Sequence, residues 1–224
     1  MDARILAIDT TSESCSVAIW SNGIVFTRFF LVSRNHEKKI LPMIRQCLID
    51  ANLDLQHIDA LAFGCGPGNF TGVRIAAGVA QGLSFGVNLP IIKISSLLTM
   101  SQGAYRKLNK KKVLVAIDAK IKEVYFAFYE LQSDGYWYGE NTESIIKIEQ
   151  FLTKINKLND NWAIAGNAWL SYPILMDKKL NLLKSDIFMP YAKDMLVLAL
   201  QKLESGEIIY SEKAWPIYIR NKFT

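Results

Sequence analysis

The sequence FGCGPGNFTGVRI, at residues 63–75, contains the features that decide the fold. Its apolar start predicts the end of a buried strand, and the glycines that follow allow a sharp turn or a close approach of a ligand to the backbone. Asn69 or Thr71 can cap the next helix, whose N-terminal N–H groups attract anions. The loop is therefore a candidate phosphate-binding site.

The helix after this loop carries Gly78, Gly82 and Gly86 at a spacing of four residues. Each interior glycine destabilises a helix by about 1 kcal/mol relative to alanine. A stripe of three indicates that another backbone comes unusually close there. That backbone belongs either to the sheet of the same chain or to another subunit, and the pattern leaves both open.

Half of the 224 residues are hydrophobic, which predicts a substantial core. No apolar run approaches the length of a membrane span, and the N-terminal residues lead directly into a strand pattern, so we expect no signal peptide and a cytoplasmic protein. The three cysteines, Cys15, Cys47 and Cys65, have no paired spacing and suggest neither disulfides nor a zinc site.

The formal net charge is +5, and the densest basic segment is RKLNKKK at residues 106–112. Such a segment either contacts nucleic acid phosphates or forms a solvated linker between two lobes. The composition favours the linker, and the contact with nucleic acid stays open.

The order of predicted elements occurs twice. An apolar strand ending in Asp9 is followed by a turn, a hairpin through Asn22-Gly23, a helix, a strand and the glycine-striped helix. The same order begins again with the strand ending in Asp118, 109 positions later in the chain. This repetition predicts an α/β fold with two similar lobes, residues 1–106 and 107–224, each a mixed sheet flanked by helices.

A duplicated lobe of this kind resembles the ASKHA fold (actin/hexokinase/Hsp70-like, ribonuclease H-like). Specific motifs resemble the TsaB (YeaZ) family of bacterial tRNA threonylcarbamoyladenosine biosynthesis proteins. They are ILAIDTTSE at 5–13, HE at 36–37, ILPM at 40–43, GPGNFTGVRI at 66–75, ISSL at 94–97, IDA at 117–119 and PIYIRN at 216–221.

The resemblance implies a part in the N6-threonylcarbamoylation of adenosine 37 in tRNAs that read codons beginning with A. It implies that a catalytic relative, TsaD, performs the transfer and that the TsaB-like chain dimerises with it, together with an ATPase, TsaE. It also implies a homodimer when the chain is alone and an indirect contact with tRNA. The chain is then a scaffold, or pseudoenzyme, with no catalytic residue and no cofactor of its own.

The residues agree with that division of labour. The His-x-x-x-His metal pair of the catalytic relative falls, in register, on Ser96 and Met100, and a neutral hydroxyl and a thioether are poor ligands for a catalytic metal. The chain has two histidines, His36 and His57, and their spacing matches no metal-ligand motif. We therefore predict no metal centre.

Asp9 and Asp118 support a competing hypothesis. In ATP-handling ASKHA proteins, carboxylates at these strand ends coordinate Mg²⁺. Under this hypothesis the chain is an autonomous ATP-dependent phosphotransferase or hydrolase that uses Asp9 and Asp118. The turns that follow contain no glycine and are poor anion nests, which favours simple Asx turns. Weak nucleotide binding in the complex stays open, in a vestigial cleft formed by Asp9, Thr10, Gly66, Gly68 and Asp118.

Two predicted helices offer a docking surface. The helix at 36–51 has an apolar stripe, although Pro42 is expected to kink it, and the next helix has the glycine stripe. Paired with two helices of a partner, they would form a four-helix seam. The predicted partner-binding residues are Ile40, Leu41, Met43, Ile44, Cys47, Leu48, Arg74, Gly78, Val79, Gly82, Leu83 and Gly86.

Overall fold

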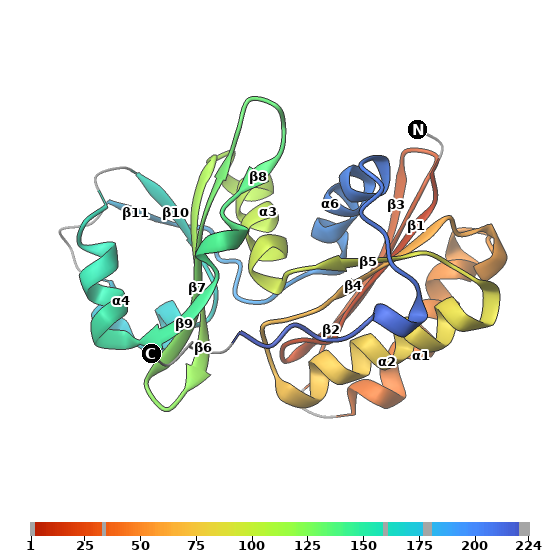
Figure 1. The fold of residues 1–224 in the computed structure, drawn as a ribbon, viewed down its shortest axis with the longest axis horizontal. Helices are drawn as coiled ribbons and strands as arrows, with labels where there is room; N and C mark the ends of the chain where they lie inside the picture. Colours follow the sequence, from red (N-terminus) through yellow and green to blue (C-terminus); the bar gives the residue numbers. More distant parts are fainter. Residues whose placement is uncertain (1–2, 33–34, 159–160, 177–180, 220–224) are drawn as a thin grey trace. The chain divides into compact units, whose positions relative to one another are not determined.

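The computed structural model describes residues 3–32, 35–158, 161–176 and 181–219. The chain divides into two compact units (Figure 1): unit 1 comprises residues 1–99 and 190–217, and unit 2 comprises residues 100–189 and 218–224. This division differs from the expected boundary between residues 106 and 107, because unit 2 already begins at residue 100 and residues 190–217 belong to the first unit. Arg220 and Asn221 of the expected closing motif lie outside the described residues.

Unit 1 contains a five-stranded mixed sheet in the order β3-β2-β1-β4-β5. Strands β1 and β2 are antiparallel, as are β2 and β3, whereas β4 is parallel to both β1 and β5. The five strands are β1 (Ile5–Asp9), β2 (Ser14–Ser21), β3 (Ile24–Leu31), β4 (Ala60–Gly64) and β5 (Ile91–Ile94). The two central strands, β1 and β4, are buried on both faces, which their continuous apolar sequences require.

Helices cover both faces of this sheet. Helices α1 (His36–Asp50) and α2 (Phe70–Val87) pack on one face, and α6 (Ala192–Glu204) packs against β1, β2, β4 and β5. The alternation of β1 explains the two layers, because Leu6 and Ile8 belong to the core beneath α1 and α2. The last helix of the chain therefore completes the first unit.

Helix α1 begins at His36 and runs through Pro42. The proline removes one helical hydrogen bond, to the carbonyl group of Lys38. Both residues are exposed, so water can reach the unpaired carbonyl. The exposed position explains why the helix continues to Asp50.

Unit 2 contains a six-stranded sheet in the order β11-β10-β6-β7-β8, with β9 also paired to β7. Its core is rich in aromatic side chains, among them Phe126, Phe151, Trp162 and Trp169. The strands are β6 (Lys112–Lys120), β7 (Glu123–Leu131), β8 (Trp137–Tyr138), β9 (Ser144–Lys147), β10 (Trp162–Ala165) and β11 (Leu182–Lys184), and the helices are α4 (Ile148–Ile155) and α5 (Ala168–Ser171). Sequence analysis did not predict β9 and β11.

The repeated order of elements is confirmed. Strands β6, β7, β10 and β11 repeat the pairing of β1, β2, β4 and β5, so the duplicated α/β fold with mixed sheets is present. Each repeat ends with a helix, α3 (Ser96–Leu108) in the first and α6 in the second. Most of α3 belongs to unit 2, where Gln102 accepts a 2.8 Å hydrogen bond from the indole of Trp137, while α6 belongs to unit 1. The two repeats thus exchange their final helices.

Short 3₁₀ helices occur in the described residues at Leu55–His57, Glu140–Thr142, Pro173–Leu175 and Ser211–Lys213. Within the described ranges, no helix combines the length and the apolar character needed to cross a membrane.

The glycine loop of unit 1 packs directly on the turn after β1. A Cβ atom at Gly68 or Gly72 would lie inside van der Waals contact with the carbonyl oxygen of Thr11 or Thr10, respectively. The hydroxyl of Thr10 donates a 2.7 Å hydrogen bond to the carbonyl of Gly72, and the N–H of Asn69 donates a 2.7 Å bond to that of Thr11. Glycine is therefore required at 68 and 72 by the protein's own backbone.

Two Gly→Ala substitutions in α2 should have opposite effects on stability. Gly72→Ala should lower the free energy of unfolding by about 3 kcal/mol, because its methyl group overlaps a backbone carbonyl. Gly78→Ala should raise it by about 0.5–1 kcal/mol, because nothing lies within 4 Å of an added Cβ there. Urea unfolding followed by circular dichroism measures both, and equal effects would contradict the packing described.

Candidate functional site

Asp9, at the end of β1, is fully buried and held by its own turn. Its Oδ1 accepts hydrogen bonds from the N–H of Thr11 at 2.9 Å and from the Thr11 hydroxyl at 3.0 Å, and that hydroxyl also lies 2.9 Å from the Ser96 hydroxyl. Gly64 packs so closely that an added Cβ would overlap the carboxylate. Burial raises the pKa of Asp9 to about 7, although both hydrogen bonds from Thr11 act to lower it. Asp9 thus forms the expected Asx turn.

The N-terminus of α2 is capped by its own side chain. The side-chain oxygen of Asn69 accepts hydrogen bonds from the N–H groups of Thr71 and Gly72 at 3.0 and 3.3 Å. Because the N–H of Asn69 is also bonded, to Thr11, these three donors are not directed at a ligand. The glycine loop that the sequence suggests as a phosphate-binding site instead packs against the chain's own backbone, with Gly66 beside the carbonyl of Ile217.

Asp118 of unit 2 is also held by neighbouring side chains. Its Oδ1 accepts hydrogen bonds from the N–H of Lys120 at 2.8 Å and from the hydroxyl of Tyr172 at 2.9 Å, and its Oδ2 lies 3.1 Å from the Lys120 ammonium. Partial burial acts to raise the pKa of Asp118, but the bonds from Lys120 and Tyr172 outweigh it and leave that pKa below its ordinary value. The carboxylate is therefore engaged within its own unit.

The other candidate catalytic residues have structural contacts. His36 is buried, and its Nε2 donates to the carbonyl of Ser12 at 3.0 Å instead of facing a nucleophile. The Nδ1 of His57 accepts the N–H of Asp54 at 3.0 Å in a surface turn. Met100 is buried. Across the residues that the structure describes, no three His, Cys, Asp or Glu side chains are grouped so that they could hold a metal ion.

The cysteines are poorly suited to nucleophilic chemistry. None of the three forms a disulfide, and all three are buried. Burial raises the pKa of the Cys15 thiol to about 12 and that of the Cys47 thiol to about 11. Because the thiolate is the reactive form, both side chains are expected to act as core residues.

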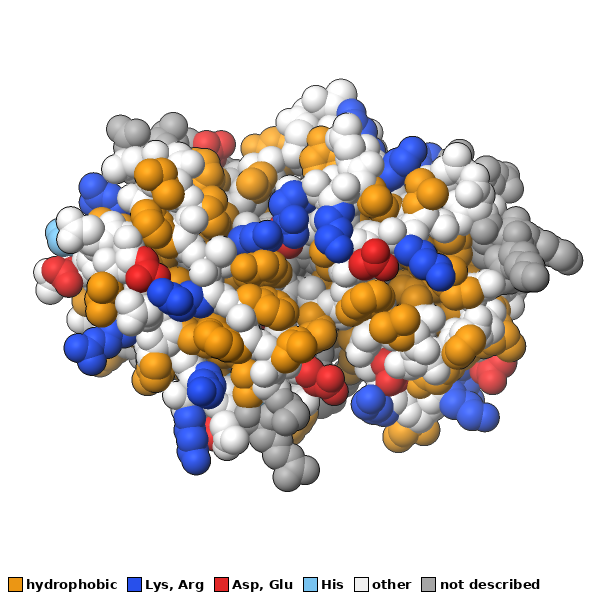
Figure 2. Space-filling model, turned by 180° about the vertical axis from the view of Figure 1, so that it is seen from behind, with side chains coloured by type: hydrophobic (Ala, Val, Ile, Leu, Met, Phe, Trp, Pro, Cys, Tyr) orange, Lys and Arg blue, Asp and Glu red, His pale blue; other side chains and the backbone are white. Residues whose placement is uncertain are grey.

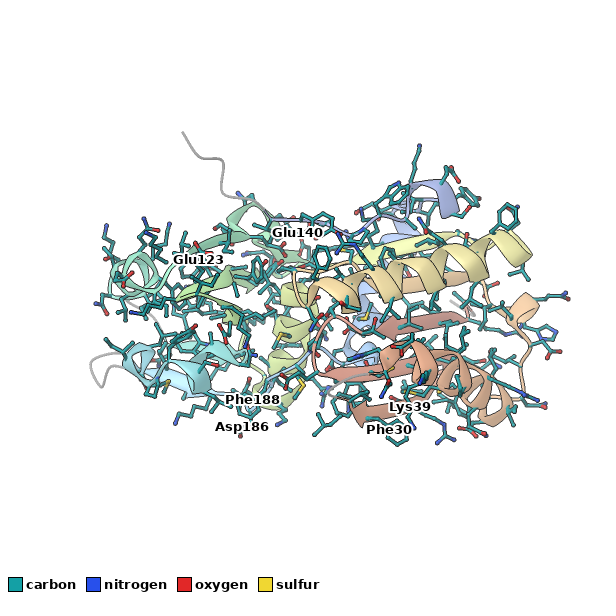
Figure 3. The ribbon with its side chains drawn as sticks, turned by 90° about the horizontal axis from the view of Figure 1, so that it is seen from below. Phe30, Lys39, Glu123, Glu140, Asp186 and Phe188 are labelled. Carbon is teal, nitrogen blue, oxygen red and sulfur yellow. The ribbon has the colours of Figure 1, made fainter. Side chains whose placement is uncertain are left out.

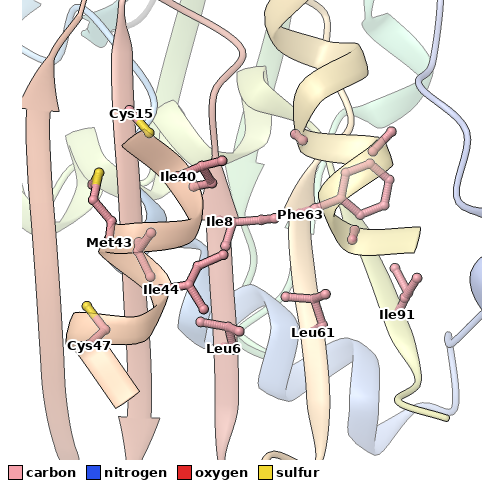
Figure 4. Packing of buried hydrophobic residues seen from close by; sticks show 14 of the residues in the cluster. Leu6, Ile8, Cys15, Ile40, Met43, Ile44, Cys47, Leu61, Phe63 and Ile91 are labelled. Atoms are coloured by element: carbon pink, nitrogen blue, oxygen red, sulfur yellow. The ribbon is translucent and has the colours of Figure 1, made fainter. Parts of the chain in front are cut away.

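The apolar stripe of α1 faces its own sheet. Ile40, Met43, Ile44 and Cys47 are at most 5% exposed and belong to the hydrophobic core that also contains Leu6 and Ile8 of β1 and Cys15 of β2 (Figure 4). This part of the predicted partner-binding set is wrong, because these side chains cannot reach another subunit while the helix stays folded. Half-buried Leu48, Val79 and Leu83 also pack against this core.

The side of α2 that faces away from the sheet is exposed, in contrast with the buried stripe of α1. Arg74, Gly78, Gly82 and Gly86 are all exposed, and an added Cβ at any of the three glycines would meet nothing within 4 Å. The alternative that the stripe packs against its own sheet is therefore wrong. Helices α1 and α2 lie side by side (Figure 3), and Leu41 of α1 is 52% exposed.

Two phenylalanines at this surface were missed by sequence analysis. Phe85, between two of the glycines, is 84% exposed, and Phe70 is 68% exposed with the Arg74 guanidinium 3.3 Å from its ring centroid. Their positions on the glycine face of the helix could have indicated them. We call Leu41, Arg74, Gly78, Gly82, Phe85 and Gly86 the outer face. Hydrophobic side chains are also exposed elsewhere, as Figure 2 shows for one side of the molecule.

Comparisons with known proteins identify close relatives. The family model described as "TsaD: tRNA N6-adenosine threonylcarbamoyltransferase" matches residues 30–205. The chain is 45% identical to the tRNA threonylcarbamoyladenosine biosynthesis protein TsaB of Escherichia coli (strain K12), over 97% of this chain and 95% of that protein. It is 41% identical to TsaB of Haemophilus influenzae, over 98% and 94% of the two chains.

A solved structure has the same fold. YeaZ from Pseudomonas aeruginosa superposes with a TM-score of 0.86 at 36% identity, covering 97% of this chain and all of that one. Together with the duplicated topology, this likeness confirms the predicted ASKHA fold class.

The buried carboxyl of Asp9 should make stability depend on pH. Its pKa is raised from 3.8 to about 7 in the folded chain, so its contribution is present in full below pH 4 and is lost as the pH rises through 7. Asp9→Asn keeps the acceptor for Thr11 and cannot ionise. Part of the contribution is already lost at pH 5, so the melting temperature of the variant should exceed that of the parent by several degrees more at pH 8 than at pH 5.

The exposed carboxylate of Glu149 in α4 provides the control. Glu149→Gln should shift the melting temperature equally at both pH values. The account of Asp9 is contradicted if the gap between Asp9→Asn and the parent is the same at pH 5 and pH 8.

Proposed function

The chain belongs to the TsaB family of tRNA threonylcarbamoyladenosine biosynthesis proteins and has a role in that modification, in which we propose that it is a non-catalytic partner subunit. In this proposal a TsaD-like subunit transfers the threonylcarbamoyl group to N6 of adenosine 37, in tRNAs that read codons beginning with A. A TsaE-like ATPase completes the complex, which we place in the cytoplasm. Alone, the chain would pair with a second copy.

The exposed glycine stripe of α2 is the observation that carries this proposal. Three glycines without a neighbour let a partner helix approach the α2 backbone, and the exposed Phe85 beside them offers a large apolar contact. Each interior glycine destabilises the helix, and no described part of the same chain packs closely on these three glycines. A close contact with a partner helix would explain why the helix carries them. A TsaD-like subunit built on the same fold can supply two equivalent helices, which would form a four-helix seam.

The state of the two strand-end carboxylates supports the absence of catalysis. Asp9 is buried beneath its own turn, and Asp118 is bonded to Lys120 and Tyr172. A carboxylate that coordinates Mg²⁺ must present an oxygen to the ion. We therefore propose that the chain has no cofactor of its own, and the autonomous phosphotransferase or hydrolase becomes the alternative for experiment to decide.

Enlarging one glycine of the outer face should block docking without harming the fold. Gly82→Leu introduces a bulky side chain into open space and replaces a poor helix former, so thermal stability should stay equal or rise. Affinity for the TsaD-like subunit, measured by isothermal titration calorimetry, should fall at least about tenfold, or by about 1.4 kcal/mol. The control is Gln150→Leu, an exposed position in α4 of unit 2.

The control should bind as the parent does. If Gly82→Leu retains full affinity, α2 is not the docking helix. If it lowers thermal stability, the stripe is an internal packing feature.

Reconstitution tests the division of labour. The purified chain should neither hydrolyse ATP nor modify tRNA, and modification should appear when the TsaD-like and TsaE-like subunits and the adenylate donor are added. Asp9→Asn should leave the rate of tRNA modification by the reconstituted complex within about twofold of the parent, because the buried Asp9 side chain takes no part in the proposed reaction. ATP turnover by the isolated chain that disappears in Asp9→Asn would establish the enzyme alternative.

A further inference from the structure

The two units differ in charge. Unit 2 contains 15 Lys and Arg and 10 Asp and Glu, whereas unit 1 contains 11 of each, so unit 2 accounts for the whole net charge of +5. Part of this excess is the segment from Arg106 to Lys112, which belongs to α3, β6 and their short connection within unit 2. The prediction that it links two lobes is therefore wrong. A surplus of positive charge on one unit attracts polyanions.

Lysines and tyrosines are exposed near the end of β7 in the second sheet. Lys110 and Lys111 precede β6 and are exposed, and Tyr136 and Tyr138, at the β7–β8 hairpin, are 42% and 57% exposed. We call these four residues the basic edge. They come from segments about 25 residues apart in the sequence, so the fold is what brings them together.

Backbone hydrogen bonds fix this neighbourhood. The N–H of Leu131 donates to the carbonyl of Lys111 at 2.8 Å, and the N–H of the next residue, Gln132, donates to the carbonyl of Tyr136 at 3.0 Å. Lys111 and Tyr136 are thus both tied to the end of β7.

Acidic residues at the same edge neutralise only part of its charge. The Lys112 ammonium lies 3.9 Å from a carboxylate oxygen of Glu130, and the hydroxyl of Tyr138 donates to Asp134 at 3.1 Å. Among the ion pairs of the described residues, none involves a lysine of the basic edge. Its two ammonium groups are therefore available to an external anion.

We propose that the basic edge is a tRNA contact surface, in which Lys110 and Lys111 bind the phosphodiester backbone while Tyr136 and Tyr138 stack on unpaired bases. Ammonium groups supply the affinity for phosphate, and aromatic rings stack on bases in single-stranded loops. Only the identity of the RNA rests on the proposed function. The contact also replaces the expectation that this chain reaches tRNA solely through its partner.

Fluorescence anisotropy of a labelled, unmodified tRNA transcript tests the proposal on the chain alone. The double variant Lys110→Glu with Lys111→Glu should bind about tenfold more weakly at about 100 mM salt. Its slope of log affinity against log salt should be shallower by about 1.5, since two phosphate contacts are lost. The double variant Tyr136→Ala with Tyr138→Ala should weaken binding to tRNA and not to a fully paired RNA duplex.

The matched control is Lys38→Glu with Lys39→Glu, which makes the same change of charge at two adjacent exposed lysines of α1. It should lower tRNA affinity by less than about twofold. The proposal is overturned if both charge reversals weaken binding equally, if the reversal at 110 and 111 has no effect, or if the parent chain binds no tRNA. Binding of the TsaD-like subunit should survive that reversal, which separates this proposal from the proposed function.

Discussion

The packing of the glycine loop on the turn after β1 is the constraint on which unit 1 depends. The carbonyl oxygens of Thr10 and Thr11 occupy the space that side chains at Gly72 and Gly68 would need, so loop and turn can only form together. That contact buries Asp9 and fixes the start of α2. The same glycines that suggest a ligand cradle in the sequence are thus used to bring two backbone segments together.

A consequence of this arrangement is a division between the inner and outer sides of the helices. Helix α2 buries Ala76, Ala77 and Ala80 against the sheet, and Gly78, Gly82 and Gly86 lie on the other side of the 3.6-residue period. The outer face combines the exposed Phe85 with three exposed glycines, at which an added Cβ would meet nothing within 4 Å. One loop therefore fixes both the buried position of Asp9 and the start of the helix that we propose for docking.

Much of the fold could be predicted from the sequence, because the strands that contain Asp9 and Asp118 and the glycine loop have strong local signals. The short strands β9 and β11 could not, since Ser144–Lys147 runs directly into a helix and Leu182–Lys184 has three residues. Periodicity also could not decide that Met43 faces the sheet while Gly78 faces outward, because a stripe shows which residues share a face and not what covers it. The exchange of α3 and α6 between the two units depends on tertiary packing, and no local sequence pattern indicates it.

Hydrogen–deuterium exchange, followed by mass spectrometry, tests the central claim most directly. Adding the TsaD-like subunit should slow exchange in α2 and in the exposed part of α1, whereas ATP with Mg²⁺ should leave residues 9–14 and 66–72 of the isolated chain unchanged. Slower exchange of those two segments with nucleotide, and none in α2 with the partner subunit, would contradict the account.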